Sequence, residues 1–441
     1  MQKKIDGTVV AIDLGSSKIK VMAAIGSEEY YEVVFHEERK SQGIINGEVV
    51  NIKSVAESLS PIISKIKEEF PSPIARIAIG ITGYNLRSYT IKERVSRKEP
   101  NHIISNNEIE ELIEKVRKGG EKRGEVVLDV IPQNYNVDDN MGVDQASGMT
   151  GTNIEGIFKV ISLKERGYLN SHKLAEYMKL EEYWLTLSPV AAAEGVLTPD
   201  EFDLGAVLLN IGAENVEMVI CHNNKVREVA IIPFGGGSIT KDISHFCGIT
   251  FDKAERVKCE EGSCISNSII EEDTILLEGS SGIEREVEKR SVINIIEARV
   301  GEIVEALLYL FERSGYSKKL RGGVVITGGA SQLLYLNKFI EERFKMEVRV
   351  ANPRVILRDG IEKTPLDPSY AVAAGLIKKG FGNLFLIGGD EERDRRVGKL
   401  FDDSGTVEES PKKEERRGHR GKKSNLGTMF NGMFEHLDNG V

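Results

Sequence analysis

The sequence predicts an α/β fold made of two similarly built halves. The stretches AIDLGSSKIKV at 11–21 and VLLNIGAENVEMVI at 207–220 each read as a strand, a turn of small residues and an alternating second strand. A third stretch, at 322–344, carries the apolar run Val324 to Ile326 ahead of the pair Gly328-Gly329. A hairpin that recurs far along the chain, with strands and helices between its copies, indicates two halves built on one plan.

The first hairpin carries residues suited to an anion and a cation. Asp13 ends an apolar run, and Gly15, Ser16 and Ser17 form the turn before Lys18. Exposed backbone N–H groups at such a turn make a concave site for an anion. Because a carboxylate beside an anion is favourable mainly when a cation lies between them, the pattern indicates phosphate with Mg²⁺.

Helices and strands alternate along the rest of the chain. Apolar periodicity predicts an amphipathic helix at 53–70, a buried strand at 76–83 and a long helix at 290–313. The segment 84–163 differs from its flanks, with more polar strands and a helix at about 107–118. This change of character favours an inserted subdomain.

The third glycine turn is followed by apolar residues at helical spacing. These residues are Leu333, Leu336, Phe339, Ile340 and Phe344. A strand, a paired-glycine turn and a helix N-terminus together let the backbone approach a ligand closely. We therefore expect a helix to begin at this glycine pair.

The C-terminal end has a different composition. Residues 389–424 are charged and contain few large apolar residues, which predicts a disordered linker. Within it, residues 412–423 hold seven Lys or Arg against two Glu, a local charge of +5. The segment 425–441 then places apolar residues on one face of a short helix. These residues are Leu426, Met429, Phe430, Met433, Phe434 and Leu437.

Three surfaces could cover this apolar stripe: a membrane, the chain's own folded part, or a groove on a partner. The basic linker that precedes the stripe favours an anionic membrane.

The composition bounds the class of protein. The chain has 441 residues, 40% hydrophobic and 29% charged, which is enough for two or more domains with full-sized cores. A formal net charge of −10 argues against a general nucleic-acid-binding surface. Four cysteines favour reduced thiols over a disulfide framework, and no stretch has the roughly 18 apolar residues of a transmembrane helix. These features predict a cytoplasmic protein with no nucleic-acid partner.

The order of these motifs resembles the actin-type ATPase fold and, within it, the FtsA family of bacterial cell-division proteins. The stretches that carry the resemblance are GVVITGGASQLLYLNKFI, IIPFGGGSITKDI, DKAERVK, LDVIPQNYNVD and SYAVAAGLIKKG. The insertion at 84–163 lies where that family carries its subdomain 1C. The linker and terminal helix are similar in type to the family's membrane-targeting tail.

The resemblance implies two halves around a nucleotide cleft, divided into subdomains. Subdomain 1A would comprise 1–83, 164–189 and 368–388, with subdomain 1C inserted at 84–163. Subdomain 2A would comprise 190–243 and 314–367, and subdomain 2B would comprise 244–313. A linker at 389–424 and an amphipathic membrane-targeting helix at 425–441 would follow.

The same resemblance implies that the glycine turns bind ATP and Mg²⁺. Asp13 would hold Mg²⁺ through water. The residues that would contact the phosphates are Gly15, Ser16, Ser17, Lys18, Gly212 and Ala213, with Gly236 beneath them. The residues that would contact the ribose and adenosine are Glu255, Lys258, Gly328, Gly329 and Ala330.

The second hairpin departs from the family pattern. Where the family usually has Asp-Ile-Gly-Gly-Gly-Thr, this chain has Asn-Ile-Gly-Ala-Glu-Asn at 210–215. Asn210 lacks the charge that would help to hold Mg²⁺, and Glu214 replaces a glycine that would let a phosphate approach. Two like charges about 4 Å apart repel by roughly 1 to 4 kcal/mol, so Glu214 either points away or replaces the missing acid. We expect nucleotide binding with at most slow hydrolysis, and we assign no catalytic residue.

The function that the resemblance implies is a filament-forming adaptor on the cytoplasmic face of the inner membrane at the division site. Segment 244–313 would bind the C-terminal peptide of the tubulin-like protein FtsZ, and later division proteins would be further partners. The tail would attach the filament to anionic lipid.

Other proteins of this fold fit the sequence less well. A sugar or acetate kinase would need a phosphoryl-acceptor pocket with a general base, and Asn210 argues against a turnover enzyme. A chaperone ATPase would need a substrate-binding domain that the linker and tail cannot supply. A pilus-assembly adaptor shares the 1C type of insertion, but we expect no basic linker and terminal helix there.

Overall fold

The computed structural model describes residues 7–70, 74–121, 124–266, 273–278, 284–358 and 366–382. All of them belong to the unit Met1–Gly389. The predicted linker at 389–424 and the predicted tail at 425–441 lie outside the described residues.

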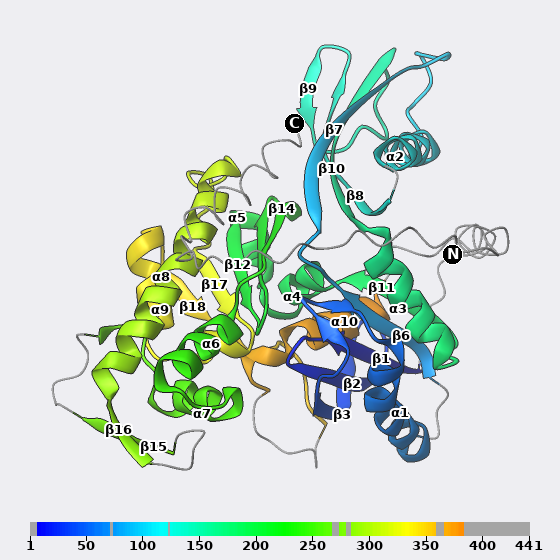
Figure 1. Ribbon diagram of the computed structural model, residues 1–441. Coiled ribbons are helices and arrows are strands. Elements are labelled where there is room, and N and C mark those ends of the chain that lie inside the picture. The colour runs from blue at the N-terminus through cyan, green and yellow to red at the C-terminus, as the bar shows by residue number, and fades with distance from the viewer. Residues whose placement is uncertain are drawn as a thin grey trace, which may run out of the picture. The chain divides into compact units, whose positions relative to one another are not determined.

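The first half is built on a sheet with the strand order β11-β6-β1-β2-β3 (Figure 1). The strands β1 (Gly7–Leu14), β2 (Lys18–Gly26) and β3 (Tyr31–Lys40) run antiparallel, whereas β6 (Ile74–Ile81) and β11 (Tyr183–Leu187) run parallel to β1. Consecutive residues of β1 are buried on both faces of the sheet, which is typical of strands in α/β proteins.

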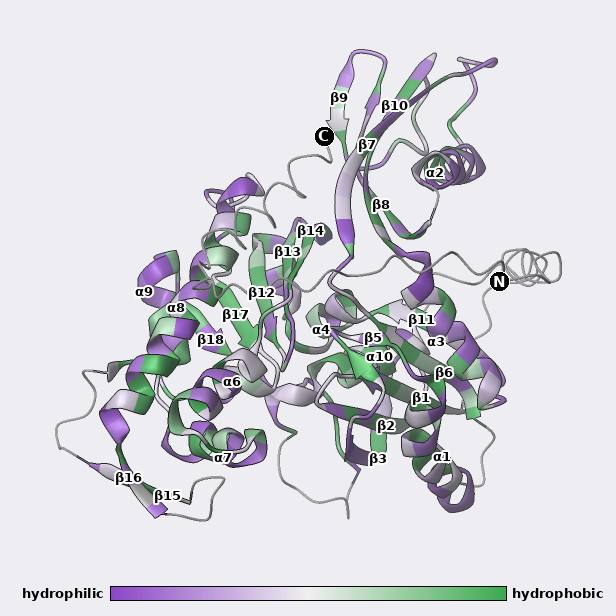
Figure 2. Ribbon diagram, in the orientation of Figure 1, coloured by the Kyte–Doolittle hydropathy of each residue, from purple (hydrophilic) through white to green (hydrophobic). Residues whose placement is uncertain are grey.

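The second half repeats this topology with the strand order β14-β13-β12-β17-β18. Here β12 (Ala206–Ile211), β13 (Val216–His222) and β14 (Lys225–Ile232) run antiparallel, and β17 (Val324–Thr327) and β18 (Val348–Val350) run parallel to β12. Figure 2 shows that the central strands of both sheets are mainly hydrophobic. The predicted α/β fold with two similar halves is therefore confirmed.

The two hairpins also match in register. Asp13 pairs with Lys20 across the first hairpin, and Asn210 pairs with Glu217 across the second. One further pair then precedes the turn in each hairpin. Equivalent positions of the two halves therefore carry different charges on the same backbone plan.

A separate sheet is inserted after β6. It has the strand order β7-β10-β8-β9 and consists of β7 (Arg87–Ser96), β8 (Glu125–Val137), β9 (Asn140–Val143) and β10 (Asn153–Lys164). The helix α2 (Asn106–Gly120) packs on this sheet and starts with a capping box between Ser105 and Glu108. Phe158 and Leu112 belong to a core cluster of its own, as expected of an inserted subdomain.

The remaining elements connect or cover these sheets. The helices are α1 (Ile52–Glu69), α3 (Glu165–Tyr177), α4 (Ser188–Val196), α5 (Pro199–Leu204), α6 (Gly236–Cys247), α7 (Phe251–Glu261), α8 (Lys289–Arg313), α9 (Leu336–Phe344) and α10 (Ala371–Phe381). The short strands are β4 (Ile44–Ile45), β5 (Glu48–Val49), β15 (Thr274–Glu278) and β16 (Glu284–Glu288). Among the described helices, none has the length and apolar character needed to cross a membrane.

The helix expected at Gly328-Gly329 begins elsewhere. A 3₁₀ turn at Gly329–Gln332 follows β17, and α9 starts only at Leu336. Tyr335 has a φ of 63°, which a right-handed helix cannot contain. The expected α-helix therefore starts seven residues after Gly329, and only a 3₁₀ turn begins at the glycine pair.

The helices α4 and α10 cross with almost no space between them. A Cβ atom on Gly375 would lie 1.6 Å from the carbonyl oxygen of Ala191, and one on Gly195 would lie 2.3 Å from that of Ala371. Because α4 leads from the first half to the second and α10 returns to pack on β1, this crossing joins the halves.

We predict that Gly375→Ala destabilises the protein. The added methyl group must push two backbones apart, and overpacking of this kind typically costs about 1–3 kcal/mol of unfolding free energy. Urea unfolding measures the change. Gly119→Ala is the matched control, since nothing lies within 4 Å of a Cβ at that helical position, and we expect it to be neutral or stabilising by up to about 1 kcal/mol. Equal stability of Gly375→Ala and wild type would contradict the close crossing.

Candidate functional site

The two halves contact each other in the space between the turns of the two hairpins. Thr82, which follows β6, donates its hydroxyl to the carboxylate of Glu217 on β13, with 2.5 Å between the oxygens. The tip of the β4–β5 hairpin contacts both turns: the N–H of Gly47 donates to Ser16 Oγ at 2.9 Å, and that of Asn46 donates to Glu214 Oε2 at 2.6 Å. The predicted phosphate turns therefore face one region of the molecule.

Both turns present backbone donors. In the described part of the chain, no hydrogen bond uses the N–H groups of Ser16, Ser17, Ala213 or Glu214. Unused N–H groups at successive turn residues attract anions. The two turns together are therefore suited to an anion that lies between the halves.

Lys20 points into this region, whereas Lys18 does not. Lys20 is only 8% exposed, and its ammonium group lies 5.6 Å from the ring centroid of Tyr370. As far as the described residues show, this ammonium makes no hydrogen bond and no ion pair. Lys18 is exposed and forms an ion pair with Glu38 on β3. Because a buried charge is costly without a partner, Lys20 is the lysine suited to a bound anion.

The sequence analysis named Lys18 and missed Lys20. The signal was its position within an otherwise apolar strand, in which the neighbouring residues Ile19, Val21 and Met22 are all buried. A lysine within a fully buried strand is rare unless something pairs with it.

Two carboxyl groups, the half-buried Asp13 and the buried Glu217, face the same region. Burial raises the pKa of Asp13 to about 6, against the opposing effect of Lys20. Burial also raises the pKa of Glu217 to about 7; hydrogen bonds from Thr82 and Asn210 oppose the shift, and the charge of Asp13 adds to it. Glu217 is 4% exposed and was missed from the sequence, although it is an acid within an apolar strand.

This pair of carboxyl groups fits a divalent cation that is completed by other ligands. A cation would favour the ionised forms of both groups, whose pKa values burial raises. Among the residues that the structure describes, no group of three or more His, Cys, Asp or Glu could hold a metal. Mg²⁺ commonly binds one or two carboxylates together with water and phosphate oxygens, so the donor set suits Mg²⁺ bound with a phosphate.

Gly328 brings the third glycine turn against the second hairpin. Its φ is 88°, and a Cβ atom there would lie 2.5 Å from Asn210 Oδ1, so the position requires glycine. The following residue pair, Gly329 and Ala330, starts the 3₁₀ turn.

The start of α6 completes this side of the site. The N–H of Gly236 donates to the carbonyl of Gly212 at 2.9 Å, and a Cβ on Gly236 would lie 2.8 Å from that of Ala330. The structure thus brings Gly212, Gly236 and the turn at Gly328 together, as the sequence-based hypothesis requires.

Glu255 and Lys258 lie beside Gly236 but bind each other. The ammonium group of Lys258 lies 2.8 and 2.7 Å from the two carboxylate oxygens of Glu255, 2.9 Å from Thr240 Oγ1 and 3.1 Å from the carbonyl oxygen of Gly236. Burial alone would raise the pKa of Glu255, yet Lys258 lowers it. The Glu255 side chain remains 41% exposed, so part of it is accessible from solvent.

The other departure in the second hairpin, Glu214, points to the β4–β5 tip. Its carboxylate accepts the N–H of Asn46, so the side chain reaches from its own turn to the tip that lies between the two turns. The dipeptide Asn46-Gly47 was also missed, although Asn-Gly between apolar residues is a strong hairpin signal.

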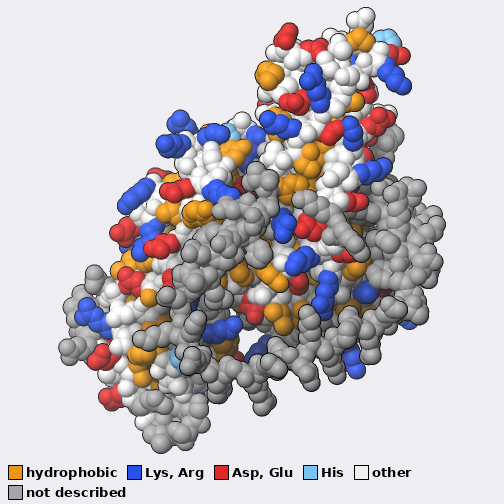
Figure 3. All heavy atoms as spheres, turned by 45° about the horizontal axis from the view of Figure 1, so that its top comes forward, with side chains coloured by type: hydrophobic (Ala, Val, Ile, Leu, Met, Phe, Trp, Pro, Cys, Tyr) orange, Lys and Arg blue, Asp and Glu red, His pale blue; other side chains and the backbone are white. Residues whose placement is uncertain are grey.

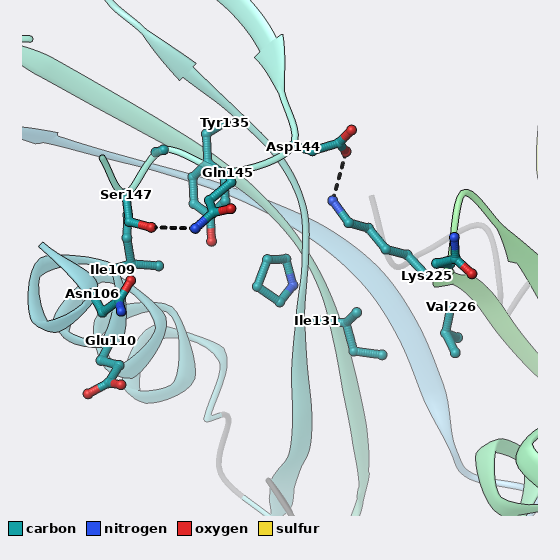
Figure 4. A pocket seen from close by; sticks show the side chains of 13 residues that line it. Asn106, Ile109, Glu110, Ile131, Tyr135, Asp144, Gln145, Ser147, Lys225 and Val226 are labelled. Atoms are coloured by element: carbon teal, nitrogen blue, oxygen red, sulfur yellow. Dashed lines mark hydrogen bonds and ion pairs between the residues drawn. The ribbon is translucent and has the colours of Figure 1, made fainter. Parts of the chain in front are cut away.

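A separate cavity of about 490 Å³ lies where the inserted sheet meets the β13–β14 turn (Figure 4). Ile109, Ile131 and Tyr135 line it, and Lys225 reaches over to Asp144 at 2.9 Å. This ion pair is a contact between the inserted subdomain and the second half. Elsewhere on the face in Figure 3, acidic and basic side chains are interspersed, whereas nucleic-acid-binding surfaces gather basic ones.

Comparison with known proteins shows which family this chain resembles. The family model "Cell division protein FtsA" matches residues 207–375, and the model of the SHS2 domain inserted in FtsA matches residues 83–162. The cell division protein FtsA of Neisseria meningitidis serogroup B is 28% identical over 375 residues, which cover 84% of this chain and 89% of that protein.

Solved structures show the fold. A PilM–PilN type IV pilus biogenesis complex matches with a TM-score of 0.61 and 15% identity, over 86% of this chain and 100% of that chain. MreB5 of Spiroplasma citri bound to ADP matches with a TM-score of 0.53 and 14% identity, over 86% and 99%. At these identities the likeness concerns the fold alone, which is actin-like.

We predict that Glu217 makes stability fall as the pH rises. Its pKa is raised from 4.5 to about 7 in the folded protein, so the folded state holds a proton that the unfolded chain has lost. The stabilisation is complete below about pH 4.5 and is lost as the pH rises through 7, by about 3 kcal/mol. Urea unfolding between pH 5 and 8, without nucleotide or Mg²⁺, measures this change. The unfolding free energy of Glu217→Gln should depend less on pH than that of the wild type. Parallel profiles for the two proteins would contradict the assignment.

Proposed function

This chain belongs to the FtsA family of cell division proteins, and we propose that it is a nucleotide-dependent adaptor that forms filaments and attaches the FtsZ ring to the inner membrane. The proposal takes the actin-like fold and the family as its premise. The observation that carries the nucleotide part is the convergence of two donor-rich turns, one unpaired buried ammonium and two carboxyl groups between the halves.

We propose that ATP and Mg²⁺ bind between the halves. The turns at Gly15–Ser17 and Gly212–Ala213 would bind the phosphates with Lys20, and Asp13 would hold Mg²⁺ through water. Gly328 to Ala330 would pack on the adenosine above Gly236. Glu255 and Lys258, already fixed to each other, would present the exposed edge of Glu255 to the ribose.

We predict that Lys20→Gln weakens ATP–Mg²⁺ binding by about 10- to 100-fold. It removes a charge-assisted hydrogen bond to phosphate, which is worth about 1.5–3 kcal/mol. Lys18→Gln is the matched control, since it removes the same charge two residues earlier on the strand, from an exposed side chain that pairs with Glu38; we expect less than a twofold effect. Isothermal titration calorimetry measures both. Equal losses in the two variants would contradict the placement of the phosphates.

The membrane part of the proposal rests on the segment 425–441, which lies outside the described residues. Burying six apolar side chains partway into a membrane contributes about 6 kcal/mol before ordering costs, and basic residues near anionic lipid add about 1 kcal/mol each. One short helix holds a monomer weakly, because stable anchoring takes two signals. Polymerisation would multiply the tails and strengthen attachment by avidity.

We predict that the double variant Phe430→Glu, Phe434→Glu no longer pellets with anionic liposomes. Two charges on the apolar face oppose its burial, while ATP binding should be unchanged. The control Glu435→Gln alters a residue of the same segment that lies off the stripe. Undiminished pelleting of the double variant would instead favour docking of the stripe on protein.

We place the FtsZ peptide on segment 244–313, as the family resemblance implies. A hollow of about 470 Å³ beside α8 supports this position. It is lined by Glu297, Gly301, Glu302, Glu305 and Arg343, among others.

We predict that Gly301→Gln weakens binding of the C-terminal FtsZ peptide at least about tenfold, because the new side chain would fill this hollow. A Cβ at Gly301 would have Phe339 Cζ as its nearest neighbour, at 3.8 Å, so the fold should tolerate the change. Fluorescence polarisation measures the affinity, with Gly119→Gln as the control on α2. Unchanged affinity would remove the peptide from this hollow.

A further inference from the structure

The tip of the β4–β5 hairpin lies between the two phosphate turns. Asn46 and Gly47 form it, with φ values of 49° and 77°, so their N–H groups point outward from a tight two-residue turn. One N–H donates to Ser16 of the first half and the other donates to Glu214 of the second half. The tip therefore joins the two turns through one hydroxyl and one carboxylate.

The tip has little freedom to move away from these partners. A Cβ atom on Gly47 would lie 2.4 Å from Thr82 Cγ2 and 3.2 Å from Asn215 Nδ2. Thr82 is itself bonded to Glu217. The Asn46 N–H is thus held in place as an anion-binding group, and the carboxylate of Glu214 is the anion that it binds.

The region is rich in negative charge before any ligand enters. Glu214 lies on the same hairpin as Glu217, and the charge of Asp13 acts on Glu217. Of the described lysines, Lys20 is the one that the hairpins supply to the site without an ion-pair partner. In the first hairpin, the position equivalent to Glu214 is the uncharged Ser17, so the excess charge comes from the second half.

We propose that Glu214 makes the site favour a nucleoside diphosphate over the triphosphate. This inference rests on the proposed binding of nucleotide between the halves. With adenosine at Gly328–Ala330, the last phosphate of the triphosphate is the group that reaches farthest between the turns. It would meet the Glu214 carboxylate and compete with it for the Asn46 N–H, whereas a diphosphate would end before both.

The test compares binding of ADP–Mg²⁺ and of the non-hydrolysable triphosphate AMPPNP–Mg²⁺ to the full chain by calorimetry. Glu214→Gln keeps an oxygen that can accept the Asn46 N–H but removes the charge. We expect it to tighten AMPPNP binding about tenfold, equivalent to about 1.4 kcal/mol, and to change ADP binding less than twofold. Glu111→Gln is the control, since it removes one exposed carboxylate from α2.

A ratio of the two affinities that is the same in wild type and Glu214→Gln would overturn the inference while leaving nucleotide binding intact. Failure of the wild type to bind either nucleotide would overturn both the inference and the proposed function.

Hydrogen exchange on the wild type supplies a second test that needs no variant. AMPPNP should change exchange at the segment containing Asn46 and Gly47 relative to ADP. Identical exchange with both ligands, both bound, would overturn the competition for the tip.

Discussion

A buried carboxyl group holds together the segments of both halves that lie beside the hairpins. Glu217 accepts the Thr82 hydroxyl from the first half and the Asn210 side-chain amide, at 2.8 Å, from its own. Removing either donor would leave a buried oxygen unsatisfied, which typically costs about 1–3 kcal/mol. The glycine turn at Gly328 packs on Asn210 in turn, so the relative position of three ligand-facing segments follows from this network.

One backbone plan carries two different sets of charges. The equivalent pairs are Asp13 with Lys20 in the first half and Asn210 with Glu217 in the second. In the first half, acid and base lie side by side on adjacent strands, and Lys20 lowers the pKa of its neighbour. In the second half, the side-chain amide of Asn210 carries no charge and only donates a hydrogen bond to Glu217. The loss of charge at Asn210 is therefore partly offset by an acid on the neighbouring strand, which sequence position alone would not pair with it.

Local sequence signals predicted the hairpins, the inserted sheet and the glycine turns, because alternation and small turn residues act over a few residues. They also named a lysine two positions from the buried one, because Lys18 directly follows the turn, whereas the burial of Lys20 depends on what packs over that part of β2. Glu217, Asn46 and the direction of Glu214 depend on register and on contacts between distant segments. The helix expected at Gly328 failed at Tyr335, whose left-handed conformation no apolar periodicity reveals.

The crossing of α4 and α10 limits the kinds of motion that the halves can make. Backbone faces backbone where the helices cross, at Gly195 and Gly375. Separation of the helices would forfeit close packing along both, whereas a small change of their crossing angle would keep it. The crossing therefore permits a small rotation of one helix on the other more readily than their separation. A change at the ligand-facing turns would then alter the angle between the halves more than the distance between them.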